Sequence, residues 1–325
     1  MTFWARICKI HNAYKLHQFS IKVKIKKSAL VALAIIVVLA TASFLIYNYQ
    51  FKDPYQFSGN TLNYAKYRGP VKYSPVLKEE NISYKIYNIS FESKPFINEK
   101  TIIYGLLFMP KGKNNVPALV FLPGGGGTKE SRAYIGRFIA EQGYAVLIID
   151  QRGVGQTGGT YLGLTEDYQA FAKGIEPTQF LSVFDTLKSF DVLRNIKGID
   201  KNKIAVSGES MGGRYAMIAA AIDNRIKGVI SISSSGFHTK DENKTYSPYL
   251  ISIDPDHYVD KISPRYLMMI HSTNDTLITL ASAEATLKLA KDPKKIYIVN
   301  NCSHGYCDKM QDDLKNALKL VFEEK

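Results

Sequence analysis

Cysteine is scarce in this chain of 325 residues: only Cys8, Cys302 and Cys307 occur. Three cysteines exclude the disulfide framework that holds small secreted domains together. No second ligand cluster has the spacing of a zinc site, so we expect no bound metal. Cys302 and Cys307 bracket a histidine in CSHGYC. A disulfide that stiffens this loop and two unrelated thiols are both open interpretations, because loop geometry decides between them.

Acidic residues are absent from the first 52 positions, which carry eight of the 42 basic residues. More than half of the formal net charge of +13 therefore belongs to this short segment. Its position beside an apolar run favours a membrane-surface or topology role over a nucleic-acid-binding face. The sequence has no helix-turn-helix pattern and no zinc-finger spacing, so we expect no nucleic-acid partner.

A long run without charge follows the basic segment: residues 29–47 read ALVALAIIVVLATASFLIY. As a helix this run would rise about 28 Å, close to the hydrocarbon thickness of a bilayer. We therefore predict a transmembrane anchor over residues 28–47, with residues 1–27 as a basic cytoplasmic tail and the C-terminal part outside the cytoplasm. One alternative is a signal peptide cleaved near Ala40-Thr41-Ala42, which would release a secreted protein. The other is a buried core helix.

The hydrophobic pattern changes beyond this run. Residues 48–80 show no sustained period and are rich in Tyr, Asn, Lys, Gly and Pro, so we interpret them as a connector. Residues 81–325 alternate buried strands with amphipathic helices, which predicts one α/β domain with a mostly parallel sheet and helices on both faces. We expect strands within 82–91, 101–109, 118–122, 145–149, 203–207, 228–232, 266–270 and 295–299, and helices within 131–142, 177–195, 212–221, 281–290 and 312–323. The first strands have short connections and should lie antiparallel at one edge.

The motif Gly208-Glu209-Ser210-Met211-Gly212 lies between the expected strand KIAVS and the next helix. A serine in this G-x-S-x-G arrangement stands on a sharp turn, and the two glycines leave room where a Cβ would strike the neighbouring strand and helix. The following helix N-terminus adds amide N–H groups and a positive dipole end. The pattern predicts Ser210 as a nucleophile, and the alternative is a structural turn with an inert serine.

A serine hydroxyl needs a base to take its proton, and the base needs a carboxylate to orient it. His304 in NNCSHGYC follows the last expected strand, and Asp275 in HSTNDTLI follows the strand before it. Both should therefore reach the same sheet edge as Ser210, in the chain order Ser, Asp, His. We predict His304 as the base and Asp275 as its partner. The alternatives are a surface-loop role for His304, a helix N-cap role for Asp275, and Asp254, Asp256 or Asp260 as the carboxylate. His271 is interpreted as a hydrogen-bonding group at the edge of the core.

A tetrahedral oxyanion needs preorganised N–H donors. We predict the Met211 amide as the first donor and the Gly125 amide, in the PGGGG loop after ALVFL, as the second. The alternatives for the glycine loop are a flexible turn and a phosphate loop, but the Gly-Lys-Ser/Thr continuation of a phosphate loop is missing. Asp150 and Arg152 are expected to brace the active-site loops, with a solvated loop as the alternative.

Six stretches within residues 100–306 resemble one group of proteins: TIIYGLLFMP, ALVFLPGGGGTKES, YAVLIIDQRGVGQTGG, IAVSGESMGG, YLMMIHSTNDTLIT and SHGY. The group comprises α/β-hydrolases of the dienelactone-hydrolase, acetyl-xylan-esterase and prolyl-oligopeptidase-like type. The resemblance implies an eight-stranded sheet, a Ser210–Asp275–His304 triad, and an acyl-enzyme mechanism without metal or organic cofactor. The chain departs from the group at Pro123, where many relatives carry histidine. It also lacks a propeller-sized N-terminal region, and residues 236–264 are its only, short candidate for a lid.

The function expected from these features is a serine hydrolase that cleaves a carboxylic ester, or an amide, of a small molecule or short peptide. A peptidase or a thioesterase of the same fold is an alternative. A further alternative from another class is a non-catalytic, membrane-anchored binding module on a hydrolase scaffold.

Overall fold

The computed structural model describes residues 27–51, 55–240 and 244–323, without the side chains of residues 44–51, 55 and 58. The chain divides into two compact units, Met1–Lys52 and Asp53–Lys325. In the first unit, helix α2 (Lys27–Phe51) forms where the sequence predicts the anchor, and its large apolar side chains between Leu30 and Leu39 are exposed.

Over the described part of the chain, no helix is long and apolar enough to cross a membrane. The transmembrane anchor predicted for residues 28–47 is therefore not supported, and the structure shows there a helix whose described side chains, those of residues 27–43, are exposed. The basic tail predicted for residues 1–27 lies outside the described residues, apart from Lys27.

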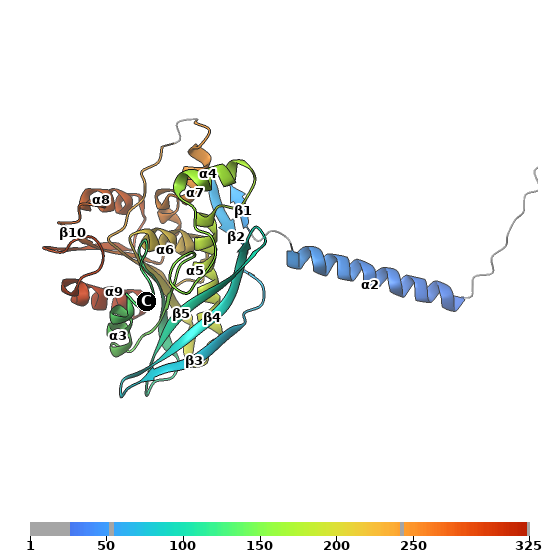
Figure 1. Cartoon of the computed structure of the whole chain (residues 1–325), viewed down its shortest axis with the longest axis horizontal. Coiled ribbons are helices and arrows are strands. Elements are labelled where there is room, and N and C mark those ends of the chain that lie inside the picture. The colour runs from blue at the N-terminus through green and yellow to red at the C-terminus, as the bar shows by residue number, and fades with distance from the viewer. Residues whose placement is uncertain (1–26, 52–54, 241–243, 324–325) are drawn as a thin grey trace, which may run out of the picture. The chain divides into compact units, whose positions relative to one another are not determined.

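A nine-stranded sheet runs through the second unit in the order β11-β10-β9-β8-β6-β7-β5-β4-β3 (Figure 1). The six strands from β7 to β11 in this order pair in parallel, whereas β5 pairs antiparallel with β7, β4 with β5 and β3 with β4. The antiparallel edge is thus confirmed, and the eight-stranded sheet implied by the resemblance is corrected to nine. The strands are β3 (Tyr73–Glu80), β4 (Tyr84–Phe96), β5 (Glu99–Pro110), β6 (Val116–Leu122), β7 (Ala145–Ile149), β8 (Ile199–Glu209), β9 (Gly228–Ile232), β10 (Tyr266–Ser272) and β11 (Lys294–Val299).

The segment interpreted as a connector carries regular structure. Strands β1 (Tyr55–Ser58) and β2 (Thr61–Tyr64) form a separate two-stranded sheet, and β3 is the ninth strand of the main sheet. Strand β3 lies at the sheet edge and most of its residues are exposed. Its sequence, YSPVLKEE, therefore has no buried face to produce the alternation by which strands are recognised.

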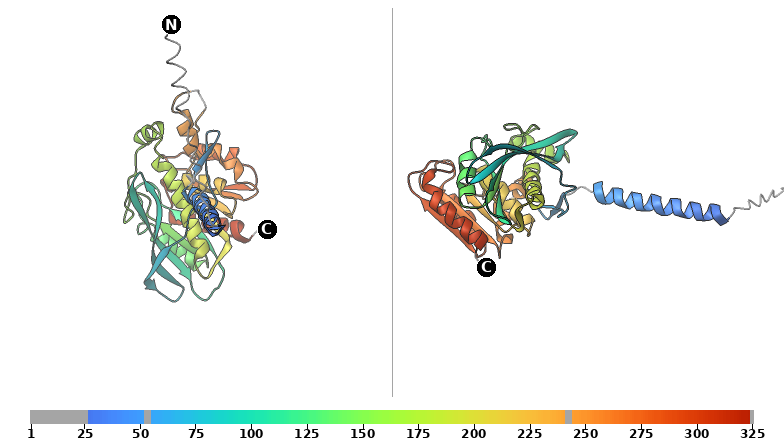
Figure 2. Two further views of the ribbon diagram at one scale, coloured as in Figure 1. Left: turned by 90° about the vertical axis from the view of Figure 1, so that its right-hand side faces the viewer. Right: turned by 90° about the horizontal axis from the view of Figure 1, so that it is seen from below.

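Helices cover both faces of the sheet. Helices α3 (Ala133–Glu141) and α9 (Gln311–Glu323) pack on one face, and α5 (Thr178–Asn195), α6 (Met211–Ile222) and α8 (Leu280–Leu289) pack on the other. Figure 2 shows the β3–β5 edge, in blue to green, on the opposite side of this unit from the red helix α9. Strands β7 and β9 are buried at every residue, which explains their continuous apolar runs.

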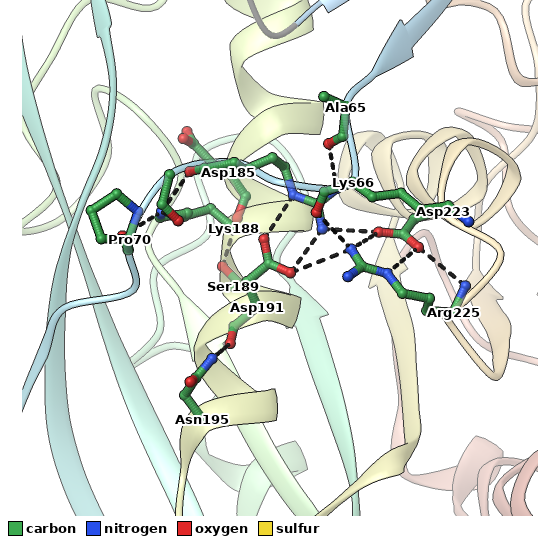
Figure 3. A network of polar contacts seen from close by, with 12 residues as sticks. Ala65, Lys66, Pro70, Asp185, Lys188, Ser189, Asp191, Asn195, Asp223 and Arg225 are labelled. Atoms are coloured by element: carbon green, nitrogen blue, oxygen red, sulfur yellow. Dashed lines mark hydrogen bonds and ion pairs between the residues drawn. The ribbon is translucent and has the colours of Figure 1, made fainter. Parts of the chain in front are cut away.

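A buried ion network fixes the segment after β2 to α5 and to the end of α6 (Figure 3). Arg68 Nε lies 2.8 Å from Asp191 Oδ2, and Arg68 Nη2 lies 2.9 Å from Asp223 Oδ2. Arg225 Nε donates to Asp223 at 2.9 Å, and Lys188 Nζ donates to the carbonyl of Arg68 at 2.8 Å. Because the Arg68 and Asp223 side chains are almost fully buried, removing one partner would leave an uncompensated charge.

Candidate active site

Ser210 occupies the turn between strand β8 and helix α6. Its backbone angles, φ 51° and ψ −123°, lie in a region that is strained for a residue with a side chain. A Cβ on Gly208 would strike the Gly212 backbone, and a Cβ on Gly212 would strike the Leu122 carbonyl on β6. Both glycines are therefore needed for the close approach of strand and helix that this turn requires.

Asp275 and His304 are in contact at the carboxyl edge of the sheet. His304 Nδ1 lies 2.8 Å from Asp275 Oδ2. The other carboxylate oxygen accepts the backbone N–H groups of Leu277 at 3.0 Å and Ile278 at 2.9 Å. The Asp275 side chain has no exposed surface, whereas that of His304 is 25% exposed. A buried carboxylate fixed by two amides holds Nδ1 of the imidazole and leaves Nε2 available for a reacting group.

The alternative roles of Asp275 do not fit these contacts. Helix α8 has Thr279 as its N-cap residue, with the hydroxyl accepting the Ser282 N–H, so Asp275 is not a helix cap. Asp254 accepts the amides of residues 237 and 239, Asp256 binds His238, and Asp260 lies 4.0 Å from Lys291. Within the described contacts, none of these three competitors reaches His304.

His271, at the end of β10, is a neighbour of Asp275 and not a rival base. Its side chain is fully buried, and Nε2 lies 2.8 Å from the Ile278 carbonyl and 3.6 Å from Asp275 Oδ2. Burial lowers the pKa of His271 by more than the Ile278 carbonyl and the Asp275 charge raise it. The neutral ring donates Nε2–H to the carbonyl and so supports the loop that carries Asp275.

The loop that carries His304 is held at several points. Ser272 Oγ donates to the Cys302 carbonyl at 2.6 Å, and Ser233 Oγ donates to the Gly305 carbonyl at 3.3 Å. Cys302 and Cys307 form a disulfide with a Cα–Cα separation of 6.2 Å. Of the two interpretations that the sequence leaves open, a disulfide and two unrelated thiols, the disulfide is therefore confirmed. It places a covalent link across the loop that carries His304.

Glu209, the residue before the serine, joins three segments of the site. One oxygen of this buried carboxylate accepts the Gly124 N–H at 3.3 Å and pairs with Arg132, and the other accepts the Tyr306 N–H at 3.3 Å. The glycine loop and the His304 loop are therefore both attached beside Ser210. Position 209 is variable in the G-x-S-x-G pattern, so the motif does not predict a role for Glu209. The only signal in the sequence is a charged residue within an otherwise apolar stretch.

The glycine loop forms a tight turn in which Gly127 N–H donates to the Gly124 carbonyl at 3.0 Å. Gly126 has a φ of +73°, which favours glycine. The Gly125 amide has no hydrogen bond within the described contacts, and a Cβ at this position would meet nothing within 4 Å. Gly125 therefore borders open space, as an amide that binds a ligand must. Met211, the other predicted donor, is the first residue of α6.

The described hydrogen bonds include none between Ser210 Oγ and His304. Catalytic hydrogen bonds are often long in unliganded enzymes and tighten when substrate binds, so this does not remove His304 as the base. Among the described residues, no three His, Cys, Asp or Glu side chains gather where they could hold a metal ion.

A cavity of about 550 Å³ lies under β3–β5 and includes none of the predicted site residues. A cavity of about 460 Å³ opens beside Ser210. This second cavity is lined by Ser210, Arg214, Ser235, Gly236, Phe237, Leu277, Ile278, Thr279 and Ser282. The second cavity is the one that matters for chemistry at Ser210, and its walls come from α6, the loop after β9, the loop after β10 and the start of α8.

One wall of this cavity carries a second Ser-His-Asp arrangement that sequence reasoning missed. His238 Nδ1 lies 2.6 Å from Asp256 Oδ2, and His238 Nε2 lies 2.7 Å from Ser282 Oγ. Ser282 Oγ is also 2.8 Å from Ser235 Oγ. Ser282 belongs to the first turn of α8 and not to a strand-to-helix elbow. No local motif links these residues, so the sequence alone gives no signal for the arrangement.

Asp150 and Arg152 brace the surrounding loops, as the sequence predicts. Asp150 accepts the Lys129 N–H at 2.7 Å and pairs with Lys129 Nζ at 2.6 Å, which holds the segment after the glycine loop. Arg152 Nε pairs with Asp185 at 2.7 Å, and both side chains are buried. The solvated-loop alternative is therefore wrong.

Comparison with known proteins identifies the fold. The family model described as alpha/beta hydrolase fold matches residues 117–252, which include the Ser210 elbow. An acetyl xylan esterase from Paenibacillus sp. R4 has the same fold, with a TM-score of 0.64 at 19% identity over 77% of this chain and 89% of that one. Over the residues that the family model matches, the chain therefore has the α/β-hydrolase fold.

Two curated proteins match parts of the chain. The uncharacterized protein YfhR of Escherichia coli O157:H7 is 24% identical over 59% of this chain and 64% of its own length. The quorum-quenching protein AidA of Acinetobacter baumannii is 32% identical over 38% of each chain. The chain thus spans less than two thirds of these curated relatives, and together with the family match they support a hydrolase.

Proposed function

We propose that this protein is a serine hydrolase that cleaves carboxylic esters, with Ser210 as nucleophile, His304 as general base and Asp275 as the residue that orients it. The hydrogen bond of 2.8 Å between His304 Nδ1 and Asp275 Oδ2 carries the proposal. It is supported by the strained Ser210 elbow and by the Glu209–Tyr306 contact, which ties the histidine loop to that elbow.

In the first half of the reaction, His304 Nε2 accepts the proton of Ser210 as the hydroxyl oxygen attacks the ester carbonyl carbon. The negative charge that forms on the carbonyl oxygen is stabilised by the amides of Met211 and Gly125. His304 then gives its proton to the leaving alcohol oxygen. The bond between the carbonyl carbon and that oxygen breaks, and the acyl group stays on Ser210.

In the second half, a water molecule gives a proton to His304 Nε2 and attacks the acyl carbon. The same two amides stabilise the second oxyanion, and His304 returns the proton to Ser210 Oγ as the acid leaves. Asp275 remains ionised in both halves and stabilises the imidazolium. The ester as substrate, in preference to an amide or thioester, is supported by the acetyl xylan esterase among the structures that share the fold.

The test is turnover of 4-nitrophenyl acetate by the Ser210→Ala variant. Removing the nucleophile should reduce kcat by about 10⁵ or more, and the circular dichroism spectrum should be unchanged. Ser83→Ala, which alters an exposed serine in the turn before β4, is the matched control and should keep full activity. A Ser210→Ala variant that retains wild-type turnover would refute the proposal.

A further inference from the structure

Arg214 lies on the wall of the cavity beside Ser210. It follows the nucleophile by one helical turn, and its backbone N–H donates to the Ser210 carbonyl at 3.3 Å. Among the residues that line this cavity, Arg214 alone is charged, because the others are apolar side chains, hydroxyls and a glycine. A bound substrate would therefore meet one fixed positive charge close to the reacting carbonyl.

The Arg214 guanidinium has no carboxylate partner among the described residues. Three other buried or half-buried arginines of this chain are neutralised: Arg68 by Asp191 and Asp223, Arg132 by Glu209, and Arg152 by Asp185. Partly buried arginines are as a rule paired in this way. Arg194 and Arg265 also lack an ion pair within the described contacts, but Arg265 donates to the Ala220 and Asp223 carbonyls and neither residue lines this cavity. Arg214 lies at the wall of the candidate active site, where a ligand could supply the anion.

The guanidinium is held in place by an aromatic ring. Its central carbon lies 4.2 Å from the centroid of Phe237, a contact in the range of a cation–π interaction. Such stacking occupies the face of the guanidinium and leaves the N–H groups at its edge free to donate. A planar fork of donors fixed in this way matches the geometry of a carboxylate.

The rest of the cavity suits a short aliphatic acid. Leu277 and Ile278 supply apolar surface, and the hydroxyls of Ser235 and Ser282 on the same wall are hydrogen-bonded to each other. Asp256, the acidic residue of the second Ser-His-Asp arrangement, is bound to His238. The cavity thus offers one guanidinium to an anionic group, together with an apolar path for a few methylene groups.

We propose that Arg214 binds a free carboxylate of the substrate, so that the preferred substrates are esters that carry a second, unesterified carboxyl group. This inference rests on the proposed hydrolase function and names its substrate class. Charge-assisted hydrogen bonds of this kind favour the anionic substrate over its neutral counterpart by about 10- to 100-fold. Arg214 is then the residue that selects the substrate, and Ser210, His304 and Asp275 perform the chemistry.

The first experiment compares matched substrate pairs. In one pair the charge is on the acyl side: mono-4-nitrophenyl adipate against 4-nitrophenyl methyl adipate. In the other it is on the leaving group: 4-carboxyphenyl acetate against 4-methoxycarbonylphenyl acetate. The readout is the ratio of kcat/KM for the anionic over the neutral member, divided by the ratio of their uncatalysed hydrolysis rates. Wild type should prefer the anionic member of one pair by about tenfold or more, and Arg214→Gln should bring that ratio close to one.

Two variants sharpen this comparison. Arg214→Lys keeps the charge but not the fork and should retain part of the preference. Arg137→Gln makes the same change on α3, where the arginine pairs with Glu79 and does not line the cavity, and should leave the ratio at its wild-type value. The inference is wrong if wild type shows no preference in either pair, or if Arg214→Gln retains it.

The second experiment separates this inference from the proposed hydrolysis. Isothermal titration calorimetry measures the binding of monomethyl adipate to the Ser210→Ala variant, which needs no turnover. Binding should weaken by about 10- to 100-fold when Arg214→Gln is added to Ser210→Ala. Equal affinity in the two proteins, or no binding to either, would overturn the role of Arg214. If binding depends on Arg214 but no ester is cleaved, the proposed hydrolysis fails and the anion site stands.

Discussion

At the residue scale, the proposed chemistry depends on how one imidazole is held. Asp275 Oδ2 lies 2.8 Å from Nδ1 of His304, and the remaining oxygen is fixed by the amides of Leu277 and Ile278. The neutral, buried His271 supports the same loop without adding charge beside the carboxylate. His304 therefore has one orientation and one tautomer available, with Nε2 left for the serine proton.

Replacing Asp275 by asparagine should lower kcat for an aryl ester by about 10⁴ with little change in the fold. The amide is neutral and does not stabilise the imidazolium, and its NH₂ group can turn towards Nδ1 and favour the wrong tautomer. Steady-state kinetics measure the loss. Asp260→Asn is the control, because Asp260 is partly exposed and lies 4.0 Å from Lys291. Near-normal activity of Asp275→Asn would remove this residue from the mechanism.

The placement of Ser210, Asp275 and His304 could be predicted because each follows a strand of the parallel part of the sheet, and such strand ends meet at one edge. The structure brings Asp275 and His304 into contact and ties the His304 loop to the residue before Ser210. Arg214 and the His238–Ser282 contact have no such local signal. Their positions depend on which loops lie over the strand ends, and this is decided by packing between distant segments.

At the element scale, three loops converge on Glu209. This buried carboxylate fixes the glycine loop through Gly124, the start of α3 through Arg132, and the histidine loop through Tyr306. The predicted oxyanion donor and the predicted base therefore share one anchor beside the nucleophile. Glu209 acts as a positioning residue, because its oxygens are occupied by protein groups.

The Glu209→Gln variant should lower kcat by about tenfold and change KM by less than about threefold. Glutamine keeps the size of the side chain but removes the charge that pairs with Arg132, so the loops lose their common attachment. Kinetics on 4-nitrophenyl acetate provide the split between kcat and KM, and thermal unfolding follows stability separately. A variant that loses stability but keeps kcat would show that Glu209 supports the fold alone.

The elements that the sequence predicts are those with a buried face. Strands β6, β7 and β9 and helices α5 and α6 contain apolar runs or periods that packing imposes on them. Strand β3 and helices α4 (Leu164–Ala172) and α7 (Ser247–Ile253) were not predicted. Strand β3 is exposed at the sheet edge, helix α4 buries only Asp167 and Ala170, and helix α7 has only seven residues, so none of them displays an apolar period.

At the scale of the whole molecule, the Arg68 network ties the segment that precedes the main sheet to α5 and α6. Burial alone would raise the pKa of Asp223, but the hydrogen bond from Arg225 and the charge of Arg68 outweigh it and lower this pKa to about 2. The ordinary value is 3.8. The folded protein therefore releases the Asp223 proton more readily than the unfolded chain does, and the ionised form stabilises the fold.

Because the pKa of Asp223 is depressed on folding, its contribution is complete above the unfolded value and is lost as the pH falls through the folded value. We expect this residue to contribute about 2 kcal/mol to the free energy of unfolding above roughly pH 4, and to lose that contribution by about pH 2. Urea unfolding across this range measures it. Asp223→Asn should flatten this part of the pH dependence, whereas Asp260→Asn should leave it intact. An unchanged slope in Asp223→Asn would contradict the assignment.

The central claim is that Ser210 is the activated serine of this molecule, and covalent labelling tests it most directly. The full chain is treated with a fluorophosphonate, which reacts with serines that a neighbouring base activates, and the modified peptide is identified by mass spectrometry. The account predicts one adduct, on Ser210, which disappears in His304→Ala. An adduct on Ser282, where His238 and Asp256 form the second arrangement, or no adduct at all, would contradict it.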